Sequence, residues 1–332
     1  MTTQKRKFLI DTDTASDDAV AILMALEYPD VEVQCITIVA GNMPVEQGST
    51  NALYTLELCK KSDKVPVYIG MTRPLSKTAQ DAKWFHGSDG MGEMHYPDPD
   101  KSKIRKEHGV DMIIKTVLEN PNEITIVTLG PLTNLGTAFR KEPKIIDLIK
   151  NIVVMGGAAC CVGNVTPAAE YNIWCDPEAA DIVFSSAKNG QITMVGWEMC
   201  RGEANLTQEE MDFCTNTIAT KKAKFAIECN YHALRSSIEW LGDPGLGQPD
   251  PVAMAVALDP KNVIPKMSQH TVKIVTDGPA RGMTIVDQLH VGASEPHIDP
   301  HWSHTGGKHL VNICWEINAK RWKEILYQCL RD

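Results

Sequence analysis

The chain has 332 residues, of which 43% are hydrophobic and 23% charged, and its formal net charge at pH 7 is −9. This composition is ordinary for a globular protein, and the length is sufficient for one large domain or two small ones. Nucleic acid and anionic membranes need a basic surface, so the charge argues against both as main partners. A small neutral substrate remains compatible with it.

The sequence offers no membrane or secretion signal. No apolar run approaches the ~18 residues that span a bilayer. The opening stretch MTTQKRKFLID lacks the apolar region of roughly 7–15 residues of a secretory signal. The ten cysteines are scattered, apart from Cys160 and Cys161, and mostly lie in apolar segments. We therefore expect buried thiols in a reducing compartment and a cytoplasmic protein.

Strand-like runs alternate with helix-like segments in the first two thirds of the chain. The strands are expected at 7–11, 31–42, 65–70, 124–130, 151–157 and 191–197. The helices are expected at 17–27, 47–60, 110–119, 132–140 and 177–187. Apolar strands that alternate with helices predict an α/β fold with a mostly parallel, Rossmann-like central sheet flanked by helices. Ligands bind such sheets at the carboxyl ends of the strands, where we place the active site.

The last third of the chain is expected to complete the same domain. Residues 204–240 look mainly helical, and the stretch LGDPGLGQPDP at 241–251 breaks this pattern. A helix at 250–260, strands within 270–278 and 309–317, and a helix at 320–330 follow. Because no repeat, low-complexity tract or linker is present, we expect a single domain over residues 1–332.

Four aspartates lie within eight positions directly after the first predicted strand: Asp11, Asp13, Asp17 and Asp18. Ser16 as an N-cap, with two acids in the first turn, would explain only Asp17 and Asp18. Close carboxylates repel one another, so a proton or a positive charge is expected among them. Hard cations prefer oxygen ligands, which favours Mg²⁺ or Ca²⁺. A solvated acidic loop is the alternative.

The stretch DTDTASDDAVAIL at 11–23 resembles the N-terminal signature of the nucleoside hydrolases of the inosine-uridine-preferring type. Seven further stretches fall in the family's order: TIVAGN (37–42), FHGSDGMG (85–92), TLGPLTN (128–134), VVMGGA (153–158), GNVTPAAEYNIWCDPEAA (163–180), DPVAMAVALDP (250–260) and RGMTIVD (281–287). Eight motifs in sequence are a strong signal. The resemblance implies a metal-dependent glycosidase of nucleoside salvage. Such an enzyme hydrolyses the N-glycosidic bond of ribonucleosides to free base and ribose, and it is a homodimer or homotetramer.

The resemblance also implies a Ca²⁺ site at the bottom of the pocket. Asp13, Asp18, Asp250 and the backbone carbonyl of Leu129 match its ligands, and Asp13 also matches the general base for the attacking water. Asp11 matches a supporting acid behind them. The residues that match ribose-binding positions are Asp17, Asn42, Met155, Asn164, Glu170 and Asn172, with Asn164 and Glu170 at the 5′-hydroxyl.

These residue types suit the reaction. Cleavage of an N-glycosidic bond passes through an oxocarbenium-like sugar, which carboxylates and hydroxyl-binding groups stabilise. A metal lowers the pKa of its bound water, and a neighbouring carboxylate can take the proton. Fixed contacts to the ribose hold the strained ring geometry that departure of the base requires.

One position departs from the family pattern. Members of this type carry a histidine as leaving-group acid immediately before the aspartate that Asp250 matches, and here that residue is Pro249. We place His86 and Trp240 on the leaving-group side instead, and the wider set of candidates adds His232, Trp84 and Trp197. Purines accept a proton at N7, and stacking on indole favours the protonated ring, so we expect a preference for purine nucleosides.

Two other functions are considered. The stretch FLIDTDT also fits a haloacid-dehalogenase-like phosphatase, with Asp11 as nucleophile, Asp13 as acid/base and Mg²⁺ as cofactor. That function requires an acidic pair after a later strand, and none follows VTLG, VMGG or MVGW. A non-catalytic nucleoside- or ribose-binding protein would explain Pro249 but not the retention of Asp13.

Overall fold

The computed structural model describes residues 5–242, 244–293, 302 and 309–331. Its described part contains a nine-stranded sheet in the order β4-β3-β2-β1-β5-β6-β7-β11-β8. All neighbouring strands pair in parallel except β8, which runs antiparallel to β11 at one edge. The strands are β1 (Arg6–Thr12), β2 (Val31–Ile38), β3 (Val67–Ile69), β4 (Ile104–Arg105), β5 (Ile124–Thr128), β6 (Asn151–Met155), β7 (Ile192–Val195), β8 (Lys266–His270) and β11 (Val311–Glu316). The predicted α/β class with a mostly parallel sheet is confirmed.

The strand order reverses at β1, which lies in the middle of the sheet. The chain adds β2, β3 and β4 on one side of β1, and β5, β6 and β7 on the other. Asp11 of β1 is in register with Thr128 of β5, so the loops that follow these two strands leave the sheet side by side. A reversal of this kind opens a crevice at the carboxyl ends of the two strands. The sequence after β1, beginning at Asp13, enters that crevice.

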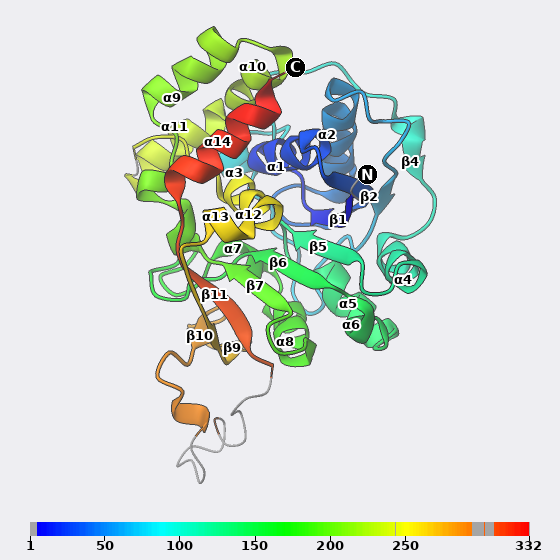
Figure 1. Cartoon of the computed structure of the whole chain (residues 1–332), viewed down its shortest axis with the longest axis vertical. Coiled ribbons are helices and arrows are strands. Elements are labelled where there is room, and N and C mark those ends of the chain that lie inside the picture. The colour runs from blue at the N-terminus through cyan, green and yellow to red at the C-terminus, as the bar shows by residue number, and fades with distance from the viewer. Residues whose placement is uncertain (1–4, 243, 294–301, 303–308, 332) are drawn as a thin grey trace.

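Helices cover both faces of the sheet (Figure 1). One face carries α1 (Ser16–Glu27), α2 (Val45–Leu58), α12 (Pro249–Leu258) and α14 (Ala319–Leu330). The other face carries α4 (Gly109–Glu119), α5 (Thr133–Lys141), α6 (Ile145–Leu148) and α8 (Pro177–Ser186). Each face has its own buried apolar cluster, and alternation along β1 sends Phe8 and Ile10 to one cluster and Leu9 to the other.

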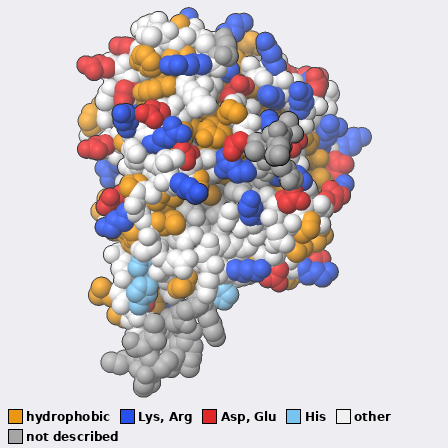
Figure 2. Space-filling model, in the orientation of Figure 1, with side chains coloured by type: hydrophobic (Ala, Val, Ile, Leu, Met, Phe, Trp, Pro, Cys, Tyr) orange, Lys and Arg blue, Asp and Glu red, His pale blue; other side chains and the backbone are white. Residues whose placement is uncertain are grey.

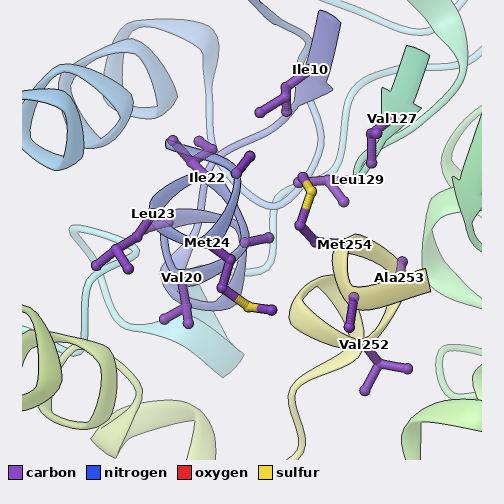
Figure 3. Close-up of a cluster of buried hydrophobic side chains, with 14 of the residues drawn as sticks. Ile10, Val20, Ile22, Leu23, Met24, Val127, Leu129, Val252, Ala253 and Met254 are labelled. Carbon is purple, nitrogen blue, oxygen red and sulfur yellow. The ribbon is translucent and has the colours of Figure 1, made fainter. Parts of the chain in front are cut away.

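Helices α1 and α12 pack against each other and are almost completely buried. All α1 residues from Ser16 to Leu26, and all α12 residues from Asp250 to Leu258, are buried. Figure 3 shows apolar side chains of both helices beside the strand ends that carry Ile10 and Val127, with Met254 of α12 next to Leu129. Removing such a side chain from water contributes about 1.5–3 kcal/mol. This packing fixes the N-terminal ends of the two helices, and with them their first-turn aspartates.

Shorter elements complete the fold. Near the carboxyl ends of the strands lie α3 (Lys83–His86), α7 (Tyr171–Cys175), α11 (Tyr231–Ser236) and η5 (Ser237–Leu241). The helical elements near α14 are α9 (Gln208–Asp212), η4 (Phe213–Ile218), α10 (Lys221–Glu228) and α13 (Pro260–Val263). Single turns occur at η1 (Lys101–Lys103), η2 (Trp197–Cys200), η3 (Gly202–Ala204) and η6 (Val291–Ala293). The two-stranded sheet of β9 (Val272–Ile274) and β10 (Thr284–Val286) lies below β11 in Figure 1.

The local predictions differ from the structure in a few places. Helix α1 begins at Ser16 with Ala15 as its N-cap, so Ser16 is not the cap. The helical segment at 204–240 is broken into short helices, two of which have π geometry. The strand predicted at 31–42 ends four residues earlier, at Ile38 of β2, and the chain then turns into the crevice. The edge strand β8 is mostly exposed and carries no apolar pattern, so it was not predicted.

The surface and the thiols agree with the composition. Lysine and arginine side chains are interspersed with aspartate and glutamate on the face shown in Figure 2. All ten cysteines lie in the described part of the chain, and each is a free thiol; eight are buried as expected, whereas Cys160 is exposed and Cys161 is partly exposed. Within that part, none of the helices combines the length and the apolar character needed to cross a bilayer.

Candidate active site

A cavity of about 110 Å³ opens at the carboxyl ends of β1, β5 and β6. Its floor contains Asp17 of α1 and Asp250 of α12. One part of the wall is made of polar residues that follow β2 and β6, and another part is made of aromatic residues of α3 and η5. All the predicted ribose-binding residues line this cavity, as do His86, Trp240 and Leu129. The structure therefore brings the predicted site residues together from distant parts of the sequence.

The floor is a cluster of buried carboxylates. Oxygen atoms of Asp17, Asp18 and Asp250 lie within 4.8 Å of one another, and all three side chains are buried. Asp18 accepts hydrogen bonds from the Thr12 hydroxyl and from the backbone N–H of Ala15 (2.9 Å). Each acid is in the first turn of α1 or α12, so two positive helix ends point at the cluster. This arrangement partly offsets the mutual repulsion of the carboxylates.

Asp13 lies beneath this cluster and is completely buried. Its Oδ2 accepts a hydrogen bond from the backbone N–H of Asn42, and its Oδ1 has no partner among the described residues. The backbone approaches it closely from two loops. A Cβ atom on Gly41 would lie 2.1 Å from Asp13 Oδ2, and one on Gly130 would lie 2.8 Å from Oδ1. These two positions require glycine because any side chain would occupy the space of the carboxylate.

Burial makes the charged forms of these acids unfavourable. Desolvation raises the pKa of Asp17 to about 6, and desolvation together with the charge of Asp17 raises the pKa of Asp18 to about 6. The pKa values of Asp13 and Asp250 are also raised well above the ordinary range, first by burial and then by the charge of Asp18. The four carboxylates therefore need protons or an external positive charge to be accommodated.

The donor set fits a hard divalent cation. It consists of oxygen atoms, and the Oδ1 atoms of both Asp13 and Asp17 are buried without a hydrogen-bond partner among the described residues. The Leu129 carbonyl, from a residue that also lines the cavity, accepts a hydrogen bond from Asn172 Nδ2 (2.8 Å) and keeps its second lone pair. Oxygen atoms in this number are the ligands that Ca²⁺ and Mg²⁺ take. The cluster could hold such a metal.

Asp11 lies behind the cluster and does not line the cavity. Its Oδ1 accepts hydrogen bonds from the Thr37 hydroxyl and from Asn134 Nδ2 (2.7 Å), and burial raises the pKa of Asp11 to about 7. Asp11 and Asp13 are both completely buried, but only Asp13 interacts with the carboxylate cluster, through Asp18. The phosphatase alternative needs Asp11 as the nucleophile, and the position of Asp11 outside the cluster does not support it.

The sugar-side wall is held by hydrogen bonds to the backbone. Glu170 is the N-cap of α7 and accepts from the N–H groups of Gly157 (2.8 Å), Asn172 (2.8 Å) and Ile173 (3.2 Å). Burial nevertheless raises the pKa of Glu170 to about 7. Asn164 Oδ1 accepts from the N–H of Tyr171, and Asn172 Nδ2 also donates to the Met155 carbonyl. The orientation of each polar group is thus fixed by main-chain atoms.

The aromatic part of the wall is more exposed. Trp84 of α3 is 52% exposed and Trp240 of η5 is 67% exposed, and their rings meet edge to face with centroids 6.0 Å apart. Pro249 lines the cavity as the first residue of α12 and offers no proton. The two tryptophans come from segments that are far apart in the sequence, so nothing local indicates their contact.

His86 is the buried polar group of this aromatic wall. Its Nδ1 is 2.9 Å from the Ser16 hydroxyl and 3.9 Å from Asp17 Oδ1. Burial lowers the pKa of His86 to about 4, against the opposing effect of Asp18, so the ring is neutral near pH 7. The contact with Asp17 is therefore not an ion pair. Ser16 therefore holds His86 in place. The sequence does not indicate this contact, because a serine at a helix start is also expected to act as an N-cap.

Three polar residues of the cavity were not predicted as site residues: Tyr171, Asn230 and Ser237. Tyr171 lies within the matched stretch 163–180, and its hydroxyl donates to the carbonyls of Gly41 (3.3 Å) or Gln80 (3.2 Å). Asn230 and Ser237 lie in the helical segment after residue 204, where the sequence shows no motif. They reach the cavity only because α11 packs against α3.

Comparison with known proteins agrees with this geometry. The family model "Inosine-uridine preferring nucleoside hydrolase" matches residues 8–324. A stretch of 181 residues is 45% identical to an uncharacterised protein of Schizosaccharomyces pombe, and the match covers 54% of this chain and 58% of that protein. The inosine-uridine preferring nucleoside hydrolase of Leishmania major is 36% identical over 284 residues, which are 85% of this chain and 88% of that one.

A solved structure extends the likeness to three dimensions. The purine-preferring ribonucleoside hydrolase from Gardnerella vaginalis superposes with a TM-score of 0.85 at 31% identity, covering 98% of both chains. The family match spans almost the whole chain, and the acidic floor lies in the crevice at the centre of the matched fold. The chain belongs to the inosine-uridine preferring nucleoside hydrolase family.

Proposed function

We propose that this protein hydrolyses the N-glycosidic bond of ribonucleosides to free base and ribose, with Ca²⁺ held by the carboxylates of the cavity floor. The observation that carries the proposal is the buried acidic cluster under a cavity with one polar wall and one aromatic wall. A ribose fits the polar wall, a nucleobase fits the aromatic one, and the bond between them then lies above the carboxylates. Family membership supports the same reaction.

We assign Asp13, Asp18, Asp250 and the Leu129 carbonyl to the cation. When bound, the cation would lower the pKa of the attacking water and orient the ribose hydroxyls. Asp13 takes the proton of that water, because one of its oxygens is held by the Asn42 amide and the other has no partner among the described residues. Asp11 fixes the end of β1 from behind and is a positioning residue.

The polar wall binds the sugar. Asp17 and Asn42 contact the ribose hydroxyls near the floor, and Asn172 does so from α7. Asn164 and Glu170 hold the 5′-hydroxyl, and Met155 packs against the ring. Because these side chains are oriented by backbone hydrogen bonds, the sugar is held in a fixed geometry while positive charge develops at its anomeric carbon.

Departure of the base is assisted from the aromatic wall. When the Ser16 hydroxyl donates to Nδ1 of His86, the ring proton of this neutral histidine is on Nε2, available to the base. A neutral imidazole stabilises developing negative charge by donating a hydrogen bond, not by carrying a positive charge. Trp240, with Trp84 held edge to face against it, stacks on the base and favours its protonated form, in place of the acid that Pro249 cannot supply.

We propose a preference for purine bases. The bicyclic face of the Trp240 indole matches a bicyclic base in area, and the relative from Gardnerella vaginalis is named purine-preferring. The relative from Leishmania major is named inosine-uridine preferring, so family membership alone does not decide between purines and pyrimidines.

The test is a panel of ribonucleosides assayed for free ribose. The protein as purified is compared with protein treated with a chelator and then supplied with Ca²⁺ or Mg²⁺. We expect ribose from inosine and guanosine at a higher kcat/KM than from uridine or cytidine, loss of activity with chelator, and recovery with Ca²⁺. Full activity in the chelated protein would remove the metal from the proposal. Phosphate release from esters without ribose release from nucleosides would overturn the reaction itself.

The cytoplasmic location and the assembly into a homodimer or homotetramer stay predictions. So does the organisation of residues 1–332 as a single domain. Fractionation of cells and the mass of the protein in solution would test the first two, and limited proteolysis would test the third.

A further inference from the structure

Asn230 occupies a helix start without acting as a cap. It precedes α11 in the N-cap position, where an asparagine side chain usually accepts a hydrogen bond from the N–H groups of the first turn. Here the side chain makes no such bond. The residue lines the cavity instead, and only 1% of its surface is exposed.

Hydrogen bonds fix which end of the amide is free. Asn230 Nδ2 donates to the Ala226 carbonyl (3.0 Å) and to Cys229 Sγ (3.3 Å). A carbonyl oxygen can only accept, so the NH₂ end must face Ala226 and the amide cannot be flipped. Oδ1 is then a buried acceptor with no partner among the described residues. Buried acceptors are rarely left unpaired, so this one points to a donor on a bound molecule.

The position of Asn230 identifies that molecule as the base and not the sugar. The segment that begins at Asn230 continues through Ser237 to Trp240, and these residues line the aromatic half of the cavity. His232 of α11 donates from Nδ1 to the Phe85 carbonyl (3.0 Å), which ties this segment to the short helix that carries His86. The free acceptor is therefore on the wall that faces the nucleobase.

We propose that the side-chain carbonyl of Asn230 accepts a hydrogen bond from an N–H on the edge of the bound base, so that Asn230 is a specificity-determining residue. This inference rests on the proposed nucleoside hydrolysis. The substrates it selects are ribonucleosides whose base presents an N–H away from the sugar, such as the N1–H of hypoxanthine and guanine. Purine riboside, which has neither a ring N–H nor an amino group on that edge, leaves the acceptor unpaired.

The test compares inosine with purine riboside in the full-length protein and in Asn230→Leu, which keeps the side-chain volume and removes the acceptor. We expect kcat/KM for inosine to fall about tenfold or more while kcat/KM for purine riboside changes less than about threefold. For each protein, kcat/KM for inosine is divided by kcat/KM for purine riboside. Comparing this ratio between the two proteins cancels the different intrinsic reactivity of the two bases. Asn262→Leu, a change at an exposed asparagine outside the cavity, is the matched control and should leave the ratio unchanged.

A second measurement needs no protein variant. In 1-methylinosine the N1–H is replaced by a methyl group, so the unmodified protein should hydrolyse it at least about tenfold less efficiently than inosine. Equal losses for inosine and purine riboside in Asn230→Leu, or no loss for either, would overturn the role of Asn230, as would equal hydrolysis of inosine and 1-methylinosine. Absence of ribose from every nucleoside with the unmodified protein would instead overturn the proposed function.

Discussion

The floor and the aromatic wall of the cavity are built in opposite ways. The floor carboxylates of Asp17, Asp18 and Asp250 are buried at the ends of two long, buried helices. The aromatic wall consists of two mostly exposed tryptophans on short helical segments. The floor is thus fixed by the core of the molecule, whereas the wall depends on the packing of two peripheral segments.

Under the proposed function, this difference separates the chemistry from the choice of substrate. A cation and a reacting water need oxygens held at fixed positions, which core helices and strand ends provide. A nucleobase needs area and a few polar contacts, which peripheral segments can vary without disturbing the sheet. We therefore expect changes in the floor to abolish turnover or metal binding, and changes in the aromatic wall to alter the response to the leaving group.

The largest effect is expected at Asp13. Asp13→Asn removes both the negative charge and the basicity that activates water, so kcat should fall about 1,000-fold without loss of the fold. Ribose release and thermal unfolding check this. Asp11→Asn, the same change in a neighbouring acid that does not interact with the carboxylate cluster, is the matched control and should cost far less activity. Near-normal turnover in a folded Asp13→Asn protein contradicts the mechanism.

Cation affinity is the next expected effect. Asp18→Ala and Asp250→Ala each leave the site one carboxylate short, so the Kd for Ca²⁺ should rise about 100-fold. Calorimetric titration of metal-free protein measures this directly. Asp259→Ala is the control, because Asp259 follows the other end of α12 and pairs with Arg321. Unchanged affinity in both floor variants would mean that the cation, if bound, is held elsewhere.

The polar wall predicts a dependence of stability on pH. Burial raises the pKa of Glu170 from 4.5 to about 7, so the folded state holds a proton there that the unfolded state releases. The stability associated with this proton is fully present below about pH 4.5 and is lost as the pH rises to about 7, by on the order of 3 kcal/mol.

Glu170→Gln removes this titration because glutamine stays neutral. The free energy of unfolding of the unmodified protein should therefore fall relative to that of the variant between pH 4.5 and 7. Denaturant titrations at several pH values, with metal absent from both proteins, measure the difference. Two parallel pH profiles would show that folding does not raise the pKa of Glu170.

The smallest effect is expected on the aromatic wall. His86→Ala and Trp240→Ala should each lower kcat/KM for inosine about tenfold, because departure of the base loses a hydrogen bond or a stacking partner. p-Nitrophenyl riboside, whose leaving group needs no acid, should be affected much less. Equal losses for both substrates would place these residues with the sugar or with folding, and would remove the proposed contrast between floor and wall.

The sequence predicted the floor and the polar wall better than the aromatic wall. Asp13 and Leu129 directly follow strands, and motifs in family order lead to Asp250 and Glu170, so chain position was sufficient to propose them. Ser16 was misassigned because a serine before two acids fits a helix cap as well as a partner for His86. The unpaired acceptor of Asn230, and the contact of Trp84 with Trp240, depend on how α11 and η5 pack on α3, which no local pattern encodes.

The floor also has a consequence for how the molecule is made. Asp17 lies near the start of the chain and Asp250 lies in its last third, and they meet only when α12 has packed onto α1. Contacts of such long sequence separation carry a high loop-closure cost, so we expect an ion to stabilise this fold after it has formed and not to nucleate it. A nascent chain that has been synthesised only as far as β7 contains Asp13, Asp17 and Asp18 but lacks Asp250. We therefore expect competence to bind an ion only once α12 has been synthesised.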